Sequence, residues 1–453
     1  MKNFLFKKVE LWVVGVLLLI FFVSIIFIAG VLRDAYLSKN KSPELLRNFF
    51  VGVSEIPKNV YRVSRHFIKD TNKPPILNRH KKKEKLKYFL NFKRNALLVL
   101  PRYDHHLSRS IVEIIDLYDF KVLHTYKHDI DEMNKQVQNI KEFPRINIDN
   151  APIRFRYMHP VILKDGSLIS DSSGPLFKID LCSNLLWIND EEVFHHSKEL
   201  NHENDIWSVG YLNPTSRLMK NIIFKDVNDD AIIKINTDGK IIYKKSVNEI
   251  LIENKKGDMV NRLGLNNDPI HINDIEPALF NSKYWNKGDV FISSRFLSAI
   301  IHYRPSTNEV INFLTGPFSQ QHDVDIISDK EITIFNNNIF FNNSSYTYNY
   351  GNVEILKYDF ANETFTKLIN ESLILDDIST SEEGLHHITN NQNIIIEEQE
   401  AGRLIMFDKN GKKLWEFINK DKNGDTYLIS WSRLIKDKNF VEKLRKLYEV
   451  KRC

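Results

Sequence analysis

The chain has 453 residues, of which 42% are hydrophobic and 27% are charged, and its formal net charge is +5. This length accommodates one large domain or two ordinary domains, each with a buried core. Its two cysteines, Cys182 and Cys453, exclude a disulfide framework and a cysteine-based metal site. They say little about the compartment, because a large core needs no disulfides even outside the cell.

The first predicted element is a membrane-spanning helix over residues 11–32, a stretch without any charge. A helix of about 20 apolar residues crosses a hydrocarbon core of ~30 Å. A cleaved signal peptide fits less well, because the run is too long and lacks a small-residue cleavage site. We therefore expect residues 1–10 to be a short cytoplasmic tail and residues 11–32 an uncleaved anchor. Basic residues flank both ends, so charge alone leaves the orientation open.

The next predicted region, residues 33–94, is a basic juxtamembrane neck. Residues 33–95 hold 17 Lys and Arg against five Asp and Glu, a net charge of +12, and the densest basic run is 79–83. A solvated segment attracted to anionic lipid head groups explains this composition. Stretches 45–53 and 60–68 suit short amphipathic helices at the bilayer. A nucleic-acid site is the weaker alternative, because no aromatic stacking pattern accompanies the charge.

From residue 95 the chain consists of short strands separated by turns, and one unit recurs. In each unit a histidine opens a strand, a polar turn leads into a second strand, and two further strands complete a set of four. The units start at His159, His196, His271, His322 and His387. Four-stranded repeats are typical of propeller blades. A β-sandwich explains the turns but not the recurring position of the histidines.

The repeats predict an all-β fold, a six-bladed β-propeller over residues 95–436. The first unit, near Ala96, lacks its opening strand, while the chain ends with an unpartnered strand over residues 427–435. If this C-terminal strand completes the first unit, the ring has six blades and no open edge. Residues 437–453 then form a basic helix or tail.

The innermost strands of a propeller converge, so the residues that open them line one mouth of the central channel. His196, His271, His322 and His387 are expected there, joined by Arg295 on the second strand of its blade. One such histidine commonly bonds a neighbouring blade, but several at one position of the repeat indicate a site. Donors around a fixed cation suit a small anion. Zinc is the competing chemistry, and the arginine argues against it.

Four short segments of the repeats carry a resemblance to a known family. They are Phe194-His195-His196-Ser197 with Ile206-Trp207, His271-Ile272-Asn273-Asp274, Ser293-Ser294-Arg295 and Gln321-His322-Asp323. These segments resemble the arylsulfate sulfotransferases (ASST type), and the resemblance covers roughly residues 96–435. It implies a six-bladed propeller, periplasmic or membrane-anchored, that moves a sulfuryl group between phenols without a nucleotide donor. The chain departs from the family's best-characterised members by lacking their separate N-terminal β-sandwich.

The resemblance also implies roles for single residues. His322 corresponds to the histidine that takes the sulfuryl group, and His196, His271 and Arg295 correspond to residues that hold the sulfate. Strand phase favours His196 over His195 as the residue facing the site. Asp323 or a backbone carbonyl is the candidate for fixing the His322 tautomer. The remaining candidates are Asn273 in substrate binding and, less directly, His387 and Arg433; no metal and no cofactor are expected.

The predicted function is sulfuryl transfer from an aryl sulfate to a phenolic or other hydroxyl acceptor through a sulfohistidine. Histidine is a nucleophile near neutral pH, since its unperturbed pKa is ~6.5, and an arginine with two imidazoles stabilises the charge that develops. The alternatives are a non-catalytic propeller that binds a sulfated or acidic ligand, and a metal-dependent propeller hydrolase.

The expected partners are a small aryl sulfate, a phenol and the membrane through residues 11–32. No nucleic acid is expected, a homo-oligomer is left open, and the propeller is placed on the periplasmic or extracellular side.

Overall fold

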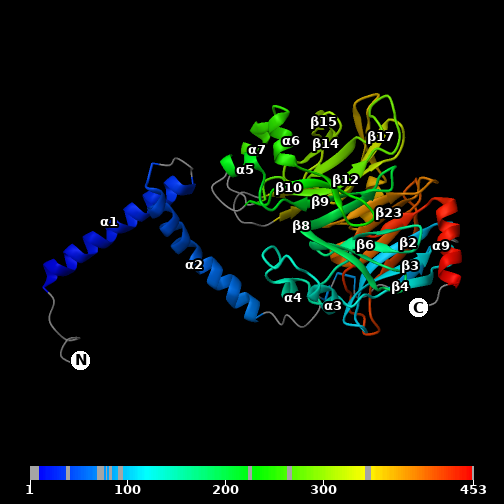
Figure 1. Cartoon of the computed structure of the whole chain (residues 1–453), viewed down its shortest axis with the longest axis horizontal. Helices are drawn as coiled ribbons and strands as arrows, with labels where there is room; N and C mark the ends of the chain where they lie inside the picture. The colour runs from blue at the N-terminus through cyan, green and yellow to red at the C-terminus, as the bar shows by residue number, and fades with distance from the viewer. Residues whose placement is uncertain are drawn as a thin grey trace. The chain divides into compact units, whose positions relative to one another are not determined.

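The computed structural model describes residues 10–36, 41–68, 76–77, 79–80, 84–89, 95–222, 227–262, 268–341 and 348–450. The chain divides into two compact units, Met1–Lys73 and Pro74–Cys453 (Figure 1). Cys453 and residues 1–9 of the predicted cytoplasmic tail lie outside the described residues.

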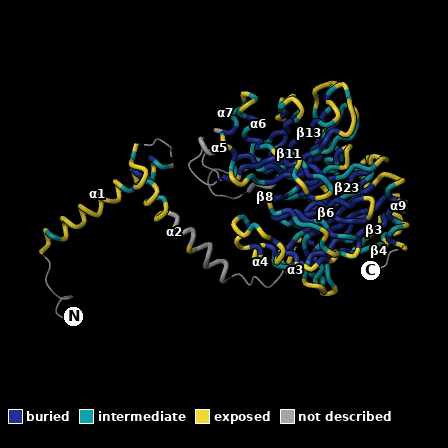
Figure 2. Tube along the Cα trace, in the orientation of Figure 1, coloured by how far each residue is buried: buried dark blue, intermediate teal, exposed yellow. Residues whose placement is uncertain are grey.

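The first unit contains two helices, α1 (Leu11–Tyr36) and α2 (Glu44–Ile68). The stretch Leu11–Ala35 has a mean hydropathy of 3.1 and none of its most apolar window is buried, which Figure 2 shows as an exposed helix. It is a candidate membrane anchor, as predicted, and is longer than the expected 11–32. The two short helices expected at 45–53 and 60–68 are instead one helix. Pro57 lies inside this helix, where a proline removes one backbone hydrogen bond, and the helix continues past it.

The second unit is a propeller-like fold of antiparallel sheets, which confirms the all-β, propeller-like part of the predicted fold (Figure 1). The first sheet, ordered β26-β2-β3-β4, contains β2 (Leu97–Asp104), β3 (Arg109–Asp116), β4 (Lys121–Tyr126) and β26 (Arg433–Ile435). A seven-stranded sheet follows in the order β11 to β5, with β5 (Met158–Ile162), β6 (Leu168–Asp171), β7 (Gly174–Ile179), β8 (Leu185–Leu200), β9 (Ile206–Tyr211), β10 (Asp230–Ile235) and β11 (Ile241–Ser246).

The next sheet, ordered β12-β13-β14-β15, contains β12 (Ile272–Pro277), β13 (Val290–Ser294), β14 (Ala299–Arg304) and β15 (Glu309–Leu314). It is followed by the sheet β16-β17-β20-β21, with β16 (Val324–Ile326), β17 (Glu331–Asn336), β20 (Glu354–Asp359) and β21 (Thr364–Leu368), and by a hairpin of β18 (Ile339–Phe341) and β19 (Tyr348–Tyr350). The last sheet, ordered β1-β25-β24-β23-β22, contains β1 (Leu86–Tyr88), β22 (Leu385–Ile388), β23 (Ile394–Glu398), β24 (Arg403–Phe407) and β25 (Lys413–Ile418).

Short helices connect these strands. They are α3 (Ile130–Lys135), α4 (Ile146–Asp149), α5 (Arg217–Ile222), α6 (Val247–Glu253), α7 (Gly257–Arg262), α8 (Asn370–Leu375) and a single 3₁₀ turn, η1 (Gln399–Ala401). The C-terminal helix α9 (Lys438–Val450) buries Val441, Leu444 and Tyr448, which lie on one face at i, i+3 and i+7. Apolar strand residues fill the space between neighbouring sheets, drawn as the dark interior of Figure 2.

Two of the sheets are each extended at one edge by a strand that lies far away in the sequence. The C-terminal strand β26 pairs with β2, with Leu97 opposite Ile435 and Val99 opposite Arg433. Strand β1 lies inside the predicted basic neck and pairs with β25, with Leu86 opposite Phe417. The end of the chain thus completes the first sheet, and part of the neck is built into the last sheet.

Candidate functional site

In each group of four strands, a residue with positive φ lies at or near the point where the first strand begins. Left-handed backbone is uncommon for residues other than glycine, and it clusters where structure holds a residue in place for function. Positive φ recurs near the start of successive units, although Gln320 and Gly384 lie two and three positions before the predicted opening residues His322 and His387. The residues are His159 (φ +40°), His196 (+53°), His271 (+49°), Gln320 (+52°), Gly384 (+129°) and Trp431 (+47°).

The motif Gln321-His322-Asp323 is fixed to the sheets on both sides. The amide of Gln321 donates to the Ser294 and Ala299 carbonyls at 2.9 and 3.0 Å. The Asp323 carboxylate accepts from the backbone N–H of His386 at 3.0 Å. Between them the backbone N–H of His322 donates to the Phe335 carbonyl at 3.0 Å. The flanking side chains therefore hold the backbone that carries His322.

The imidazole of His322 is fully buried and uses one of its two nitrogens. Nδ1 lies 2.6 Å from Oδ1 of Asn337, whereas Nε2 has no hydrogen-bond partner among the described residues. Burial, and after it the charge of Arg295, lowers the pKa of His322 to about 3. The ring is therefore neutral at neutral pH, and one of its nitrogens is free to react.

The His196 ring lies close to His271 and Trp431, and His195 is its neighbour on the same strand. The His196 ring is 5.2 Å from that of His271 and 5.6 Å from that of Trp431. Its Nδ1 lies 2.7 Å from Nδ1 of His195, whose Nε2 is 3.4 Å from Oδ1 of Asp230. Burial and the neighbouring His195 lower the pKa of His196 well below its usual value.

His271 and Arg295 come from adjacent strands of one sheet. The backbone N–H of Arg295, the residue after β13, donates to the His271 carbonyl at 2.9 Å. The His271 Nδ1 lies 2.5 Å from Oδ2 of Asp268. The Arg295 guanidinium is 5.4 Å from the centre of the Phe296 ring and donates to the Ser381 carbonyl at 3.2 Å. These contacts place a cation beside His322, whose pKa it lowers.

Asn273 is buried on β12, where its amide donates to the Gln321 carbonyl at 2.8 Å. It therefore supports the backbone next to His322. Its Oδ1 has no partner among the described residues.

The remaining predicted residues have other partners. Nε2 of His387 lies 3.0 Å from the Ser432 carbonyl. Arg433 donates to the Pro160 carbonyl at 3.0 Å and pairs with Glu199 at 2.8 Å, so it joins the first sheet to its neighbour.

The Asp323 carboxylate lies 2.6 Å from Nδ1 of His386. The expected partner of His322 Nδ1 was Asp323 or a backbone carbonyl, but the observed partner is Asn337. Asp323, Asp325 and His386 offer ligand atoms within 4.8 Å of one another, so this group can hold a metal ion.

Sequence reasoning missed Asn337 in the site and gave Trp431 only a structural place. Trp431 is fully buried, its ring centre lies 5.7 Å from that of His159 and 6.5 Å from that of His322, and its Nε1 has no partner among the described residues. The signal for Trp431 was its place just before the C-terminal strand, the position that histidines occupy in other units. Asn337 follows β17 in a run of asparagines and offers no such signal.

With this geometry in place, one comparison decides the family. A family model described as arylsulfotransferase (ASST) matches residues 159–420, more than half of the chain. The chain belongs to the arylsulfotransferase (ASST) family. The matched segment contains the four motifs that resemble this family, together with Asn337 and the loop that holds it.

Other comparisons are more distant. No curated protein matches the chain. A protein of unknown function from Bacteroides caccae is 10% identical, with a TM-score of 0.44, over 76% of this chain and 99% of that one. A virginiamycin B lyase from Staphylococcus aureus is 12% identical, with a TM-score of 0.40, over 78% and 99%. A likeness at this level says nothing about activity.

Proposed function

We propose that this member of the ASST family transfers a sulfuryl group from an aryl sulfate to a phenolic or other hydroxyl acceptor through a sulfohistidine at His322. Membership of the family supports aryl sulfotransferase activity in general. The observation that carries the mechanism is the state of the His322 ring. Its Nδ1 is engaged by Asn337, while its Nε2 is buried and has no partner among the described residues.

In the first step, Nε2 attacks the sulfur, the N–S bond forms, and the bond from sulfur to the aryl oxygen breaks. The electron pair of that bond leaves with the phenolate. In the second step, the acceptor oxygen attacks the same sulfur and the N–S bond breaks, with its electron pair returning to Nε2. The acceptor's proton passes to the phenolate released in the first step. Charge spreads over the equatorial oxygens in both steps, and preorganised donors stabilise it. Arg295, His196 and His271 supply these donors, and Asn273 supports the segment that carries the nucleophile.

The ring of sheets is proposed to have six blades, closed by the C-terminal strand. In support, β26 pairs with β2, and β8 serves two neighbouring groups of four strands with a register shift between His195 and Lys198. Deleting residues 426–436 should then prevent folding, because the edge of β2 loses its partner. Circular dichroism melting tests this. A deletion protein that still melts cooperatively near the wild-type temperature contradicts closure.

For the whole chain we propose a cytoplasmic tail (1–10), an anchor (11–32), a neck (33–94), a catalytic propeller (95–436) and a C-terminal helix (437–453). The propeller lies on the periplasmic or extracellular side, as is usual for the family, and binds a small aryl sulfate and a phenol rather than nucleic acid. Protease treatment of intact cells tests the side, since protection of the propeller until the membrane is broken contradicts it.

The function is tested by mixing the protein with a chromogenic aryl sulfate, with and without a phenol. A soluble version should begin at residue 74, because Leu77, Arg79 and β1 contact the last sheet or its loops. We expect phenol-dependent turnover and a sulfuryl adduct on the protein, seen by mass spectrometry after quenching at neutral or alkaline pH. Loss of turnover on chelation favours the metal-dependent hydrolase, and ligand binding without adduct or turnover favours the binding module.

A further inference from the structure

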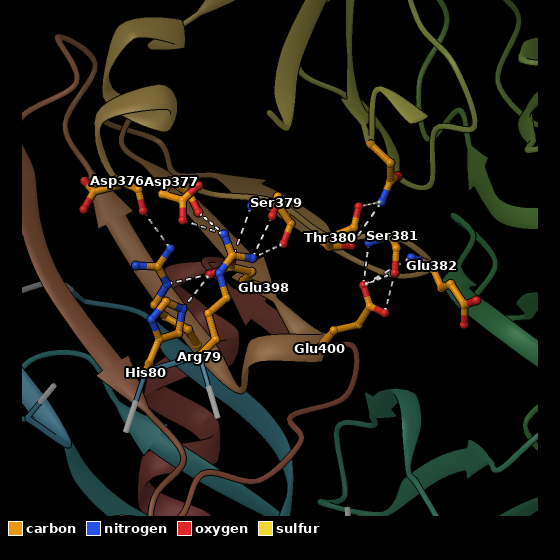
Figure 3. A network of polar contacts seen from close by, with 12 residues as sticks. Arg79, His80, Asp376, Asp377, Ser379, Thr380, Ser381, Glu382, Glu398 and Glu400 are labelled. Atoms are coloured by element: carbon orange, nitrogen blue, oxygen red, sulfur yellow. Dashed lines mark hydrogen bonds and ion pairs between the residues drawn. The ribbon is translucent and has the colours of Figure 1, made fainter. Parts of the chain in front are cut away.

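The loop between α8 and β22, residues 376–384, connects the nucleophile to a segment that precedes the propeller strands. It is called the 376–384 loop below. It carries the partners of Asn337 on one side and those of Arg79 on the other (Figure 3). Each link in this connection is a hydrogen bond or ion pair between described residues.

The first link is the orientation of the Asn337 side chain. Its Nδ2 donates to the Glu383 carbonyl at 2.9 Å, to Oγ1 of Thr380 at 3.1 Å and to the Thr380 carbonyl at 3.3 Å. Only the NH₂ end of an amide can face two carbonyl oxygens. Oδ1 must therefore face His322, where it accepts from Nδ1–H at 2.6 Å. A neutral imidazole protonated at Nδ1 carries its lone pair on Nε2, the nitrogen that the proposed reaction uses.

The second link is the position of the 376–384 loop. Glu400 accepts from the backbone N–H of Ser381 at 2.5 Å and from its hydroxyl at 2.7 Å. Arg295 donates to the Ser381 carbonyl at 3.2 Å. The same loop therefore holds both the partner of the nucleophile and the cation beside it.

The third link is Arg79, which lies about 300 positions earlier in the chain and spans the other half of the loop (Figure 3). Its guanidinium donates to the Ser379 carbonyl and hydroxyl at 2.8 and 2.7 Å and to the Asp377 carbonyl. It also pairs with Glu398 at 2.9 Å, a carboxylate with no exposed surface that accepts from the backbone N–H of Ser379 at 3.0 Å.

A single exposed ion pair contributes little, and the Arg79 side chain is 32% exposed. The guanidinium of Arg79, however, contacts two loop carbonyls, a hydroxyl and a buried carboxylate at the same time. The planar guanidinium satisfies such a set in one geometry, which an ammonium cannot do.

We propose that Arg79 is a positioning residue for His322: it holds the 376–384 loop, the loop holds Asn337, and Asn337 keeps the proton of His322 on Nδ1. This rests on the proposed function, because it assigns the reacting nitrogen of the same histidine. A residue from the predicted basic neck thereby influences the chemistry of the propeller. The remainder of the neck is not required by this connection.

The test uses full-length protein in lipid vesicles, with Arg79→Ala, Arg79→Lys and Asn337→Ala variants. The matched control is Arg304→Ala, because Arg304 is similarly exposed and loses a two-bonded pair with Asp289 that does not involve the loop. Two quantities are measured: the rate of adduct formation with an aryl sulfate, and the His322 tautomer by magic-angle-spinning NMR of ¹⁵N-histidine protein. His322→Asn protein assigns the signal.

Asn337→Ala should slow adduct formation by up to about 10⁴-fold, the loss seen when a catalytic histidine takes the wrong tautomer, and should show His322 protonated at Nε2. Arg79→Ala should shift the tautomer in the same direction by a smaller fraction and slow the adduct about tenfold, with partial recovery in Arg79→Lys. Arg304→Ala should change neither quantity.

An Arg79→Ala protein with the wild-type tautomer and adduct rate overturns the proposal. If Arg79→Ala does not fold, Arg79→Lys decides the matter, since wild-type values for both quantities in that variant overturn it equally. The tautomer signal separates this inference from the proposed function. If the wild-type protein forms no adduct but Arg79→Ala still shifts the His322 tautomer, the positioning role is retained and the sulfotransferase mechanism is removed.

Discussion

Two buried histidines in neighbouring sheets have very different surroundings. His322 lies just before β16 and His386 lies within β22, and neither has exposed surface. His386 has a protein oxygen close to each nitrogen: a carboxylate oxygen of Asp323 lies 2.6 Å from Nδ1, although not in hydrogen-bond geometry, and the Thr333 hydroxyl lies 2.7 Å from Nε2. Among the described residues, His322 has a hydrogen-bond partner at Nδ1 alone. An imidazole engaged at both nitrogens joins strands, whereas one engaged at a single nitrogen can react.

The largest difference between the two histidines is expected when each is replaced with asparagine. His322→Asn removes the atom that carries the sulfuryl group, so we expect no adduct on mixing with an aryl sulfate. His386→Asn should lose stability, because the Asp323 carboxylate and the Thr333 hydroxyl lose a buried partner, but it should still form the adduct. Mass spectrometry of the donor-treated, rapidly quenched proteins measures both outcomes. A mass increment on His322→Asn protein, or on a peptide lacking residue 322, contradicts the assignment.

The propeller-like fold could be predicted from the sequence, because short strands alternating with polar turns indicate propeller blades. The position of each histidine in its unit predicts which of them converge. The choice of His196 over His195 rests on strand phase, since neighbouring residues on a strand face opposite sides, and it stays a prediction.

The features that distinguish His322 from His386 were beyond that reasoning. Asn337 lies 15 positions from His322, and its own anchors at Thr380 and Glu383 are a further 43 and 46 positions away. No local pattern encodes such contacts. The basic composition of 33–94 likewise suggested a solvated neck, and a three-residue strand such as β1 is too short to show any period.

Replacing Arg295 is expected to have the next largest effect, since Arg295 lies beside the reacting histidine. Arg295→Ala retains the nucleophile but removes the charge that stabilises the transferring group. One preorganised donor of this kind contributes about 10²–10³ in rate, so we expect the adduct to appear that much more slowly. Arg295→Lys should recover part of the rate, because an ammonium cannot reproduce the fork of the guanidinium. Rapid-quench adduct kinetics measure this, and a wild-type rate for Arg295→Ala removes the residue from the site.

The smallest expected effect concerns acid stability. Burial lowers the pKa of His322 to about 3, whereas the unfolded chain has the usual value of ~6.5. Between these values the unfolded state binds a proton that the folded state does not, so stability is fully present above about pH 6.5 and is lost as the pH falls. The loss attributable to this one group has a limiting slope of about 1.4 kcal/mol per pH unit.

His322→Asn removes this titration, so its melting temperature should fall less steeply than that of the wild type between pH 6.5 and 4. Burial also lowers the pKa of His386, and His386→Asn should reduce the acid sensitivity in the same direction. Calorimetric melting of the three proteins at matched pH values measures the slopes. Equal slopes for wild type and His322→Asn mean that His322 is protonated in the folded protein at mildly acidic pH. A charged imidazole has no lone pair on Nε2, so adduct formation should then also fall as the pH drops below about 6.5.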